Sequence, residues 1–198
     1  MSAVFELISQ GLPLDGLQWD SSQRPQAAVL VALSDEESPR VMLGRRTRHL
    51  RHHPGEIAFP GGKREETDPT PWATALREAA EEVGMPVDTP RPLGELSPLV
   101  TRTGFEVHPC VAVVPPGFDP LVDVREFESV FTQPLQRFAA RDLFRLESIE
   151  IEGRLRMVPH YDIDGDNIWG VTAAVLALLA NIAYDARLEL HRDWSVAP

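Results

Sequence analysis

The sequence predicts an α/β protein, on the basis of two kinds of stretch that alternate along the chain. Two apolar runs, at residues 27–33 and 106–114, have the length and composition of buried strands. Two other stretches have helical character, one that ends at Gly84 and one that runs from Trp169 to about Tyr184. With 198 residues, no internal repeat and no second unit of distinct composition, we expect a single domain over residues 1–198.

The first quarter of the chain should contribute a peripheral helix and the first strands. Residues 1–26 are interpreted as a short amphipathic helix, with Val4, Leu7 and Ile8 on its apolar side, followed by a Pro-rich linker on the outside of the molecule. A buried strand is expected at 27–33. The segments that follow it are a turn at 35–39, a strand at 40–46, a loop rich in Arg and His at 47–54 and a strand at 56–59.

The second half should alternate strands and loops before a final helix. We expect strands at 92–99 and 106–114, an irregular loop at 117–125, and a hairpin of 144–151 with 155–161 around Gly153. The acidic run 162–167 has the composition of a calcium loop. An EF-hand, however, requires Gly at its sixth position and Glu at its twelfth, which are here Asn167 and Ala173. An Asp-Gly turn between strands is the simpler interpretation.

Residues 55–85 contain the side chains most suggestive of chemistry. An apolar run ends in Pro60-Gly61-Gly62, a polar loop follows, and a helix then leads to Gly84. At about 100° per residue, three carboxylates of this helix share one face; they are Glu78, Glu81 and Glu82. The other face is expected to dock on the sheet through Ala73, Leu76, Ala80 and Val83.

These three carboxylates would destabilise an isolated helix. Like charges three and four residues apart repel by about 0.2–0.5 kcal/mol per pair, and the helix dipole disfavours anions in the last turn by roughly 0.3–1 kcal/mol each. A divalent cation would reverse both effects, whereas a solvated acidic face would only reduce them. The glycines just upstream favour the cation, because phosphate chemistry needs close backbone approach and a hard cation on oxygen ligands.

The stretch resembles the box of the Nudix hydrolases, G-x5-E-x7-R-E-U-x-E-E-x-G-U, in which U is a bulky aliphatic residue. Residues 77–85, Arg-Glu-Ala-Ala-Glu-Glu-Val-Gly-Met, match its second half, except that Ala79 is small for the first U position. One extra residue lengthens the first half, so Glu65, Glu66 and Asp68 are all candidates for the upstream acid. The resemblance implies a Nudix-type α/β/α sandwich with a mixed β-sheet and a loop-helix-loop catalytic box at residues 55–85.

Residues 42–62 are similar to the signature of the coenzyme A pyrophosphatases within the Nudix family, L-L-T-x-R-[SA]-x3-R-x3-G-x3-F-P-G-G. Arg46, Arg51, Gly55 and the Phe-Pro-Gly-Gly at 59–62 fall in register without gaps, whereas Gly44 stands where the pattern has Thr. The longer box is also a property of this subgroup.

A later segment, residues 126–135, resembles the pattern E-V-x-x-V-F-x-x-P-L of the same subgroup, with Phe127 in place of the first Val. Glu126 takes the acidic position of that pattern.

The resemblance implies metal-dependent hydrolysis of the diphosphate bond of coenzyme A or its derivatives, to adenosine 3′,5′-bisphosphate and 4′-phosphopantetheine, with Mg²⁺ or Mn²⁺ as cofactor. The implied metal ligands are Glu78, Glu81 and Glu82. The implied catalytic residues are Glu81 and Glu126, as alternative bases, and Arg77, which orients the glycine loop or a glutamate. The implied substrate contacts are Arg46, Arg51, Phe59, Gly61, Gly62 and Lys63.

The charge distribution indicates a small anionic ligand. A net charge of −11 argues against nonspecific nucleic-acid binding, which depends on neutralising phosphates. Seven basic residues nevertheless lie between Arg40 and Arg64, and before Lys63 only Glu56 opposes them. From composition alone, this basic island fits a polyanionic ligand and a solvated loop equally well; the family signature favours the ligand.

The same composition predicts a cytoplasmic protein that does not enter a membrane. No apolar run approaches the ~20 residues that span a bilayer, and the start of the chain lacks the basic region of a signal peptide. The single cysteine, Cys110, lies in an apolar run where a buried thiol is expected, and it suits a reducing compartment. The sequence leaves both a monomer and a homodimer open.

Two other functions remain open from the sequence. A Nudix pyrophosphatase acting on ADP-ribose, dinucleotides or nucleoside diphosphate sugars would use the same chemistry, and only the basic loop argues against it. A non-catalytic nucleotide-binding Nudix module is the alternative of another class. Such a module would be expected to lose box glutamates, whereas this chain has all three.

Overall fold

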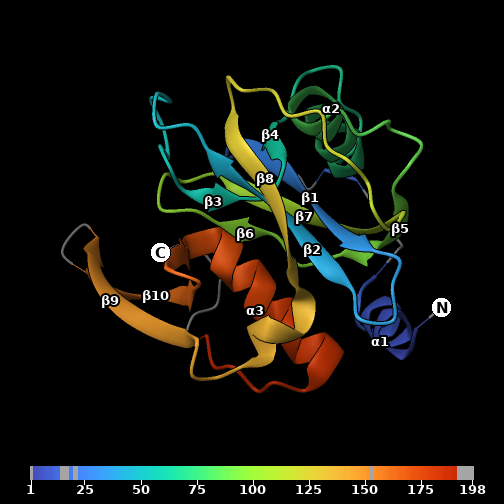
Figure 1. Cartoon of the computed structure of the whole chain (residues 1–198). Helices are drawn as coiled ribbons and strands as arrows, with labels where there is room; N and C mark the ends of the chain where they lie inside the picture. Colours follow the sequence, from blue (N-terminus) through green and yellow to red (C-terminus); the bar gives the residue numbers. More distant parts are fainter. Residues whose placement is uncertain (1, 14–17, 20–21, 152–153, 191–198) are drawn as a thin grey trace.

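A computed structural model describes residues 2–13, 18–19, 22–151 and 154–190. In this part of the chain, eight strands form one mixed sheet whose main order is β3-β2-β1-β7-β5 (Figure 1). The central pair, β1 (Gln26–Ser34) and β7 (Glu106–Val114), is parallel, and the other pairings described in this sheet are antiparallel. The long buried runs of β1 and β7 follow from this position, because a central strand is covered on both faces.

The remaining elements extend the main sheet and add a smaller one. The other strands of the main sheet are β2 (Arg40–Arg46), β3 (Ile57–Ala58), β4 (Gly61–Lys63), β5 (Arg91–Glu95), β6 (Leu99–Val100) and β8 (Phe127–Pro134). A 3₁₀-helix, η1 (Leu135–Ala139), follows β8. The smaller sheet has the order β11-β10-β9 and consists of β9 (Phe144–Ile151), β10 (Arg154–Ile163) and β11 (Asp166–Trp169).

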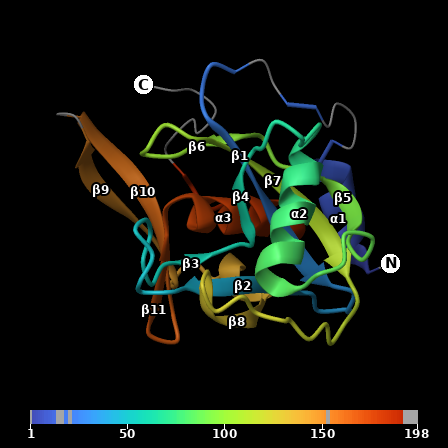
Figure 2. The same cartoon turned by 90° about the horizontal axis from the view of Figure 1, so that it is seen from above.

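Helices cover both faces of the main sheet. Helix α2 (Pro71–Val83) lies on one face, and α1 (Ala3–Gly11) and α3 (Gly170–Tyr184) lie on the other (Figures 1 and 2). Each face has its own buried apolar cluster; Trp72 and Ala79 belong to the α2 side, and Phe5 and Leu176 to the opposite side. This layered arrangement confirms the predicted α/β/α sandwich with a mixed sheet.

Several sequence predictions agree closely with the structure. The strands expected at 40–46 and 106–114 have those limits, the final helix ends at Tyr184, and Cys110 is buried. The turn between β10 and β11 contains Asp164 and Gly165, both with positive φ, as an Asp-Gly turn requires. Gly153 and residues 14–17 and 20–21 of the Pro-rich linker lie outside the described residues. Among the helices that the structure describes, none is long and apolar enough to cross a membrane.

The predicted buried faces of two helices were correct only in part. In α1, Ile8 is buried and Val4 packs against the core as predicted, but Leu7 is 47% exposed and Phe5 is buried instead. In α2, Val83 is buried and the partly buried Leu76 packs against the same cluster, as predicted, whereas Ala73 and Ala80 are only partly buried. The sheet-facing stripe of α2 consists instead of Trp72, Ala75, Ala79 and Val83.

The large ring of Trp72 explains this rotation, because it is the largest apolar surface that α2 can bury. As a consequence, Glu82 lies beside the buried stripe, and only 5% of its surface is exposed. The predicted acidic face is therefore not uniformly solvated.

The segment at residues 56–63 also differs from the prediction. The strand expected at 56–59 is only β3, and Gly61 and Gly62, expected at its end, lie in a further strand, β4, which pairs antiparallel with β1; Pro60 separates the two strands. The strand expected at 92–99 is divided into β5 and β6. Both differences occur next to a proline, Pro60 or Pro98, where the backbone lacks the N–H that continues a ladder.

Candidate active site

The glycine strand β4 brings backbone donors to the C-terminal part of α2. A Cβ on Gly61 would overlap the carbonyl oxygen of Ala28, so only glycine allows β4 to lie this close to β1. The N–H of Gly61 donates to Oε2 of Glu82 at 2.9 Å. The buried carboxylate of Glu82 is thereby fixed at the edge of the main sheet.

The second glycine makes room for another carboxylate. A Cβ on Gly62 would overlap the carboxylate of Glu78, which is itself only 17% exposed. The two glycines therefore accommodate two glutamates of α2. Gly61 donates a hydrogen bond to Glu82, and Gly62, which has no side chain, leaves room for the carboxylate of Glu78. This contact explains why two successive glycines precede an acidic helix.

Asp68 anchors the loop between β4 and α2. Its carboxylate accepts hydrogen bonds from the hydroxyl of Thr74 at 2.7 Å, from Nη2 of Arg77 at 3.0 Å and from the N–H of Glu65 at 3.0 Å. Burial opposes its ionisation, but these donors outweigh burial and lower the pKa of Asp68 to about 2. Of the three candidates for the upstream acid, Asp68 is the buried one; Glu65 and Glu66 are exposed.

Arg77 connects this loop to the acidic helix. Its Nη2 also donates to the carbonyl oxygen of Lys63 at 3.2 Å, while Nη1 contacts Glu78 at 3.0 Å and Glu81 at 3.4 Å. The guanidinium thus joins Asp68, the end of β4 and two glutamates. This geometry agrees with the orienting role expected for Arg77.

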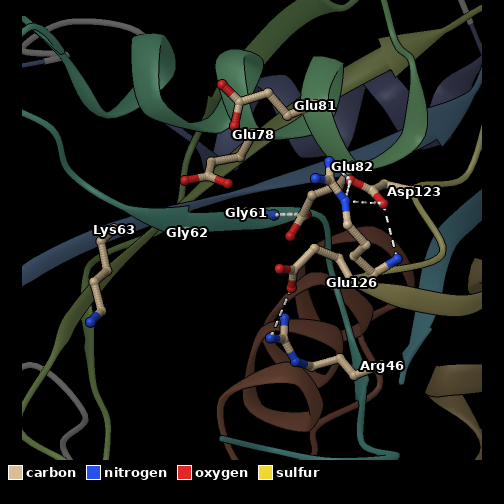
Figure 3. A pocket seen from close by; sticks show the side chains of 10 residues that line it. Arg46, Gly61, Gly62, Lys63, Glu78, Glu81, Glu82, Asp123 and Glu126 are labelled. Carbon is tan, nitrogen blue, oxygen red and sulfur yellow. Dashed lines mark hydrogen bonds and ion pairs between the residues drawn. The ribbon is translucent and has the colours of Figure 1, made fainter. Parts of the chain in front are cut away.

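The glycines of β4 and the glutamates of α2 line an open pocket of about 820 Å³ (Figure 3). One wall comes from β4 and α2, and the other comes from the end of β2 and the loop that precedes β8. The lining residues are Arg46, Gly61, Gly62, Lys63, Glu78, Glu81, Glu82, Asp123, Arg125 and Glu126. Five carboxylates, three from α2 and two from the loop, thus face the same space as the backbone of the two glycines.

Burial strongly affects the two inner glutamates. It is the main cause that raises the pKa of Glu82 to about 8; the Gly61 N–H and Arg46 oppose this shift, and the charges of Glu78 and Glu126 add to it. Burial likewise raises the pKa of Glu78, although Arg77 opposes that change. A positive charge placed between these carboxylates would favour their ionised forms.

The carboxylates fit a hard cation by chemistry, but they do not converge on one point. In the described part of the chain, no three Asp, Glu, His or Cys side chains are grouped closely enough to hold a metal ion. Each inner glutamate has its own partner, Gly61 for Glu82 and Arg77 for Glu78. Carboxylate oxygens are nevertheless the ligands that Mg²⁺ and Mn²⁺ prefer, so the chemistry of the side chains fits such a cation.

Two predicted substrate contacts lie elsewhere. The side chain of Phe59 belongs to the core on the α1–α3 side of the sheet and is 3% exposed. Arg51 is exposed on the loop after β2 and does not line the pocket. The other predicted site residues line the pocket, except Arg77, which lies behind its wall and holds Glu78 and Glu81.

The sequence analysis missed Asp123 and Arg125. They line the pocket and form an ion pair of 2.6 Å with each other. Their loop is attached to the end of α2, because Leu121 N–H donates to Val83 O at 3.0 Å and Asp123 N–H donates to Glu82 O at 2.8 Å. The only sequence signal for them was their position just before Glu126, because the return of the loop to α2 is a long-range contact.

Comparisons with known proteins agree with the fold and the box. The sequence profile of the NUDIX domain family matches residues 24–153. Nudix hydrolase NudL of Enterobacter sp. (strain 638) is 38% identical over 168 residues, which cover 81% of this chain and 84% of that protein. NudL of Yersinia pestis (strain Pestoides F) is 38% identical over 162 residues, with 81% and 80% coverage.

A solved structure gives the same result for the fold. The NUDIX hydrolase from Alicyclobacillus acidocaldarius is 19% identical and superimposes with a TM-score of 0.52 over 84% of this chain and 96% of that one. At this identity the likeness concerns the fold alone.

Proposed function

The chain belongs to the Nudix hydrolase family and is a diphosphatase, and from this premise we propose that its substrate is coenzyme A or a coenzyme A derivative. Hydrolysis of the diphosphate bond would give adenosine 3′,5′-bisphosphate and 4′-phosphopantetheine. The observation that carries this proposal is the position of Arg46. This arginine of the coenzyme A signature lines the same pocket as Glu78, Glu82 and Glu126.

We propose Mg²⁺ or Mn²⁺ as the cofactor, held by Glu78 and Glu82 together with Glu81. The donor set supports a hard cation, because all three side chains offer carboxylate oxygens at one pocket. When bound, the cation would neutralise charge on the diphosphate oxygens and lower the pKa of a bound water.

The protein residues would orient the substrate and accept a proton. The backbone of Gly61 and Gly62 permits close approach of phosphate, and Arg46 offers a guanidinium fork that suits phosphate oxygens. Glu81, which is 61% exposed, and Glu126, which is 38% exposed, are the two candidates that would take the proton of the attacking water. Arg77 would hold Glu78 and Glu81 in position.

A second candidate is hydrolysis of ADP-ribose, dinucleotides or nucleoside diphosphate sugars. The exposed position of Arg51 and the buried position of Phe59 favour it, because they leave two signature residues without a contact to the pocket. The box chemistry would be identical in this case. A non-catalytic module is less well supported, since Glu78, Glu81 and Glu82 all line the pocket.

Turnover of a substrate panel tests the proposal. Coenzyme A, ADP-ribose, NADH and 8-oxo-dGTP are compared at equal concentration with Mg²⁺ or Mn²⁺, and the products are identified by mass. We expect the highest kcat/KM for coenzyme A. A preference for ADP-ribose by orders of magnitude would contradict the substrate while leaving the reaction class intact, and binding of all four without turnover would favour the non-catalytic module.

A further inference from the structure

Arg46 reaches the pocket from the end of β2, and only part of its guanidinium group has a hydrogen-bond partner in the described part of the chain. Its Nη2 contacts Oε2 of Glu126 at 3.3 Å, the long end of the range for such a pair. Its Nε is buried and has no hydrogen-bond partner among the described residues. The edge formed by Nε and Nη2 is the one that binds an anion in bidentate fashion, so one of its two donors is unsatisfied.

A β-bulge directs Arg46 and Glu126 to each other. The register of β2 with β8 shifts between Arg45 and Arg46, so Arg45 pairs with Ser129 while Arg46 pairs with Phe127. Without the shift, Arg46 would pair with Glu128, so the bulge moves Arg46 one residue closer to Glu126. Arg45 points to the other face, as successive strand residues do, and its Nη2 contacts Asp166 of β11 at 2.7 Å. Bulges near functional sites commonly redirect one side chain in this way.

The backbones that carry the pair are fixed on both sides. The N–H of Arg46 donates to Glu56 O at 2.9 Å, and the N–H of Thr47 donates to Glu126 O at 2.9 Å. A change of partner therefore needs only rotation of the two side chains. The carboxylate of Glu126 has 38% exposure, and a single contact to one guanidinium at such an exposed position is weak.

We propose that Arg46 exchanges Glu126 for a substrate phosphate, and that this exchange releases Glu126 into the carboxylate cluster of the pocket. In the free site, Nη2 of Arg46 holds Glu126 and Nε has no acceptor. In the bound site, two oxygens of the diphosphate accept hydrogen bonds from Nε and Nη2 of Arg46, so the buried Nε gains an acceptor. The inference rests on the proposed function, because it requires a diphosphate in this pocket.

The released carboxylate has a defined place to act. Glu126 follows the loop that is bonded to the end of α2, so its backbone stays next to Glu82 when the side chain leaves Arg46. A free carboxylate there can accept a proton or contact a cation, whereas one paired with arginine is poorer at both. Arg46 is therefore a positioning residue for Glu126 as well as a phosphate contact, and Glu126 becomes available only when the substrate is in place.

Binding of methylenediphosphonate, which cannot be hydrolysed, tests the exchange without turnover. The four proteins are wild type, Glu126→Gln, Arg46→Gln and the double variant, and affinities come from NMR titration in EDTA and again with Ca²⁺. With Arg46 present, Glu126→Gln should increase the affinity for methylenediphosphonate about fivefold to tenfold, because Arg46 no longer has to break an ion pair with Glu126 to bind it. In the Arg46→Gln background the same change should alter affinity by less than about twofold.

Glu81→Gln is the matched control, because Glu81 lines the pocket and pairs with Arg77 rather than Arg46. It removes one negative charge, and its effect should be the same in both Arg46 backgrounds. Equal effects of Glu126→Gln in the two backgrounds would show simple charge repulsion and would overturn the exchange.

A second measurement uses the wild-type chain. The Nε–H resonance of Arg46, assigned by its loss in Arg46→Lys, should move downfield on saturation with the diphosphonate as Nε gains an acceptor. Saturation with an unmoved resonance would overturn the exchange alone. If the diphosphonate fails to bind even with Ca²⁺, the proposed diphosphate site itself is contradicted, so the two failures are distinguishable.

Discussion

The ring of Phe127 lies directly over Gly44, and a Cβ at position 44 would overlap it. Gly44 is in β2, and the fully buried Phe127 begins β8, the strand that pairs with β2. At these same two positions the chain departs from the coenzyme A pyrophosphatase patterns, which have Thr and Val there. The two departures therefore compensate each other: the large ring of Phe127 fills the space that the missing side chain of Gly44 leaves.

This exchange predicts strong coupling between the two positions. Gly44→Thr alone should reduce the free energy of unfolding by about 1–3 kcal/mol through overpacking, and Phe127→Val alone by about 2–4 kcal/mol through a cavity. The double variant should recover 1–3 kcal/mol relative to the sum of the single losses. Urea denaturation measures all four proteins, and strictly additive losses would show that the side chains do not share this space.

Gly62→Ala should impair catalysis more than folding. The added methyl group would displace the carboxylate of Glu78, which is the movable end of a side chain, so the backbone need not shift. Misplacement of a reacting group by about 1 Å can cost roughly 10²-fold in rate. We expect a loss of this size in kcat with a small change in thermal stability.

Gly117→Ala is the matched control for that variant. Gly117 has a positive φ of 72°, and a Cβ there would contact nothing within 4 Å. We expect a loss of about 1 kcal/mol in stability from backbone strain and an unchanged rate. Equal rates of the Gly62→Ala enzyme and wild type would mean that Glu78 can act from another position.

Asp68→Asn should identify the upstream acid of the box. The variant weakens the contact with Arg77, so both kcat and stability should fall, whereas Glu66→Gln at an exposed neighbouring position should change neither. A steady-state assay and thermal melts of the two variants provide the comparison. A larger kinetic effect from Glu66→Gln would assign the role to Glu66 instead.

The stabilising effect of Asp68 should depend on pH. Its folded pKa of about 2 lies below the ordinary value of 3.8, so its contribution is complete above pH 4 and is lost as pH falls toward 2. The stability difference between wild type and Asp68→Asn should therefore shrink over this range. A constant difference from pH 5 to pH 2 would argue that Arg77 does not favour the ionised form.

Glu82→Gln should abolish hydrolysis and change the pH dependence of stability of the metal-free protein. The folded pKa of Glu82, about 8, exceeds the ordinary value of 4.5. Stability of wild type in EDTA should therefore decrease as pH rises from about 4.5 to 8, because the unfolded chain ionises first. Urea midpoints at pH 5 and pH 8 should differ less in the variant. Unchanged hydrolysis would remove this carboxylate from the mechanism.

Local patterns in the sequence predicted the fold and the acidic face of α2, and the resemblance to the Nudix family added Arg46, Lys63 and Glu126. The buried strands, the helix that ends at Gly84 and the glutamates of the box all depend on short-range periodicity or spacing. The role of Asp68 could not be decided in this way, since three acids lie within four residues and only burial distinguishes them.

Other features depend on contacts between distant segments. Trp72 sets the rotation of α2 against the sheet, which the spacing of alanines did not reveal. The place of Asp123 and Arg125 in the pocket follows from backbone hydrogen bonds between their loop and α2. Phe59 was predicted to contact the substrate because it lies next to the glycines in the sequence. Its side chain instead faces the opposite side of the sheet, where it packs in the core.

The two hydrogen bonds from Leu121 and Asp123 to the carbonyls of Val83 and Glu82 have a consequence for substrate range. They tie the segment before β8 to the end of the acidic helix, so moving the backbone at Glu126 away from Glu82 for a bulkier ligand would strain or break these bonds. Tolerance of different groups beyond the diphosphate would then come from side chains that can reorient without a change in the main chain, such as Lys63 on the wall formed by β4 and α2 and Arg46 on the other wall.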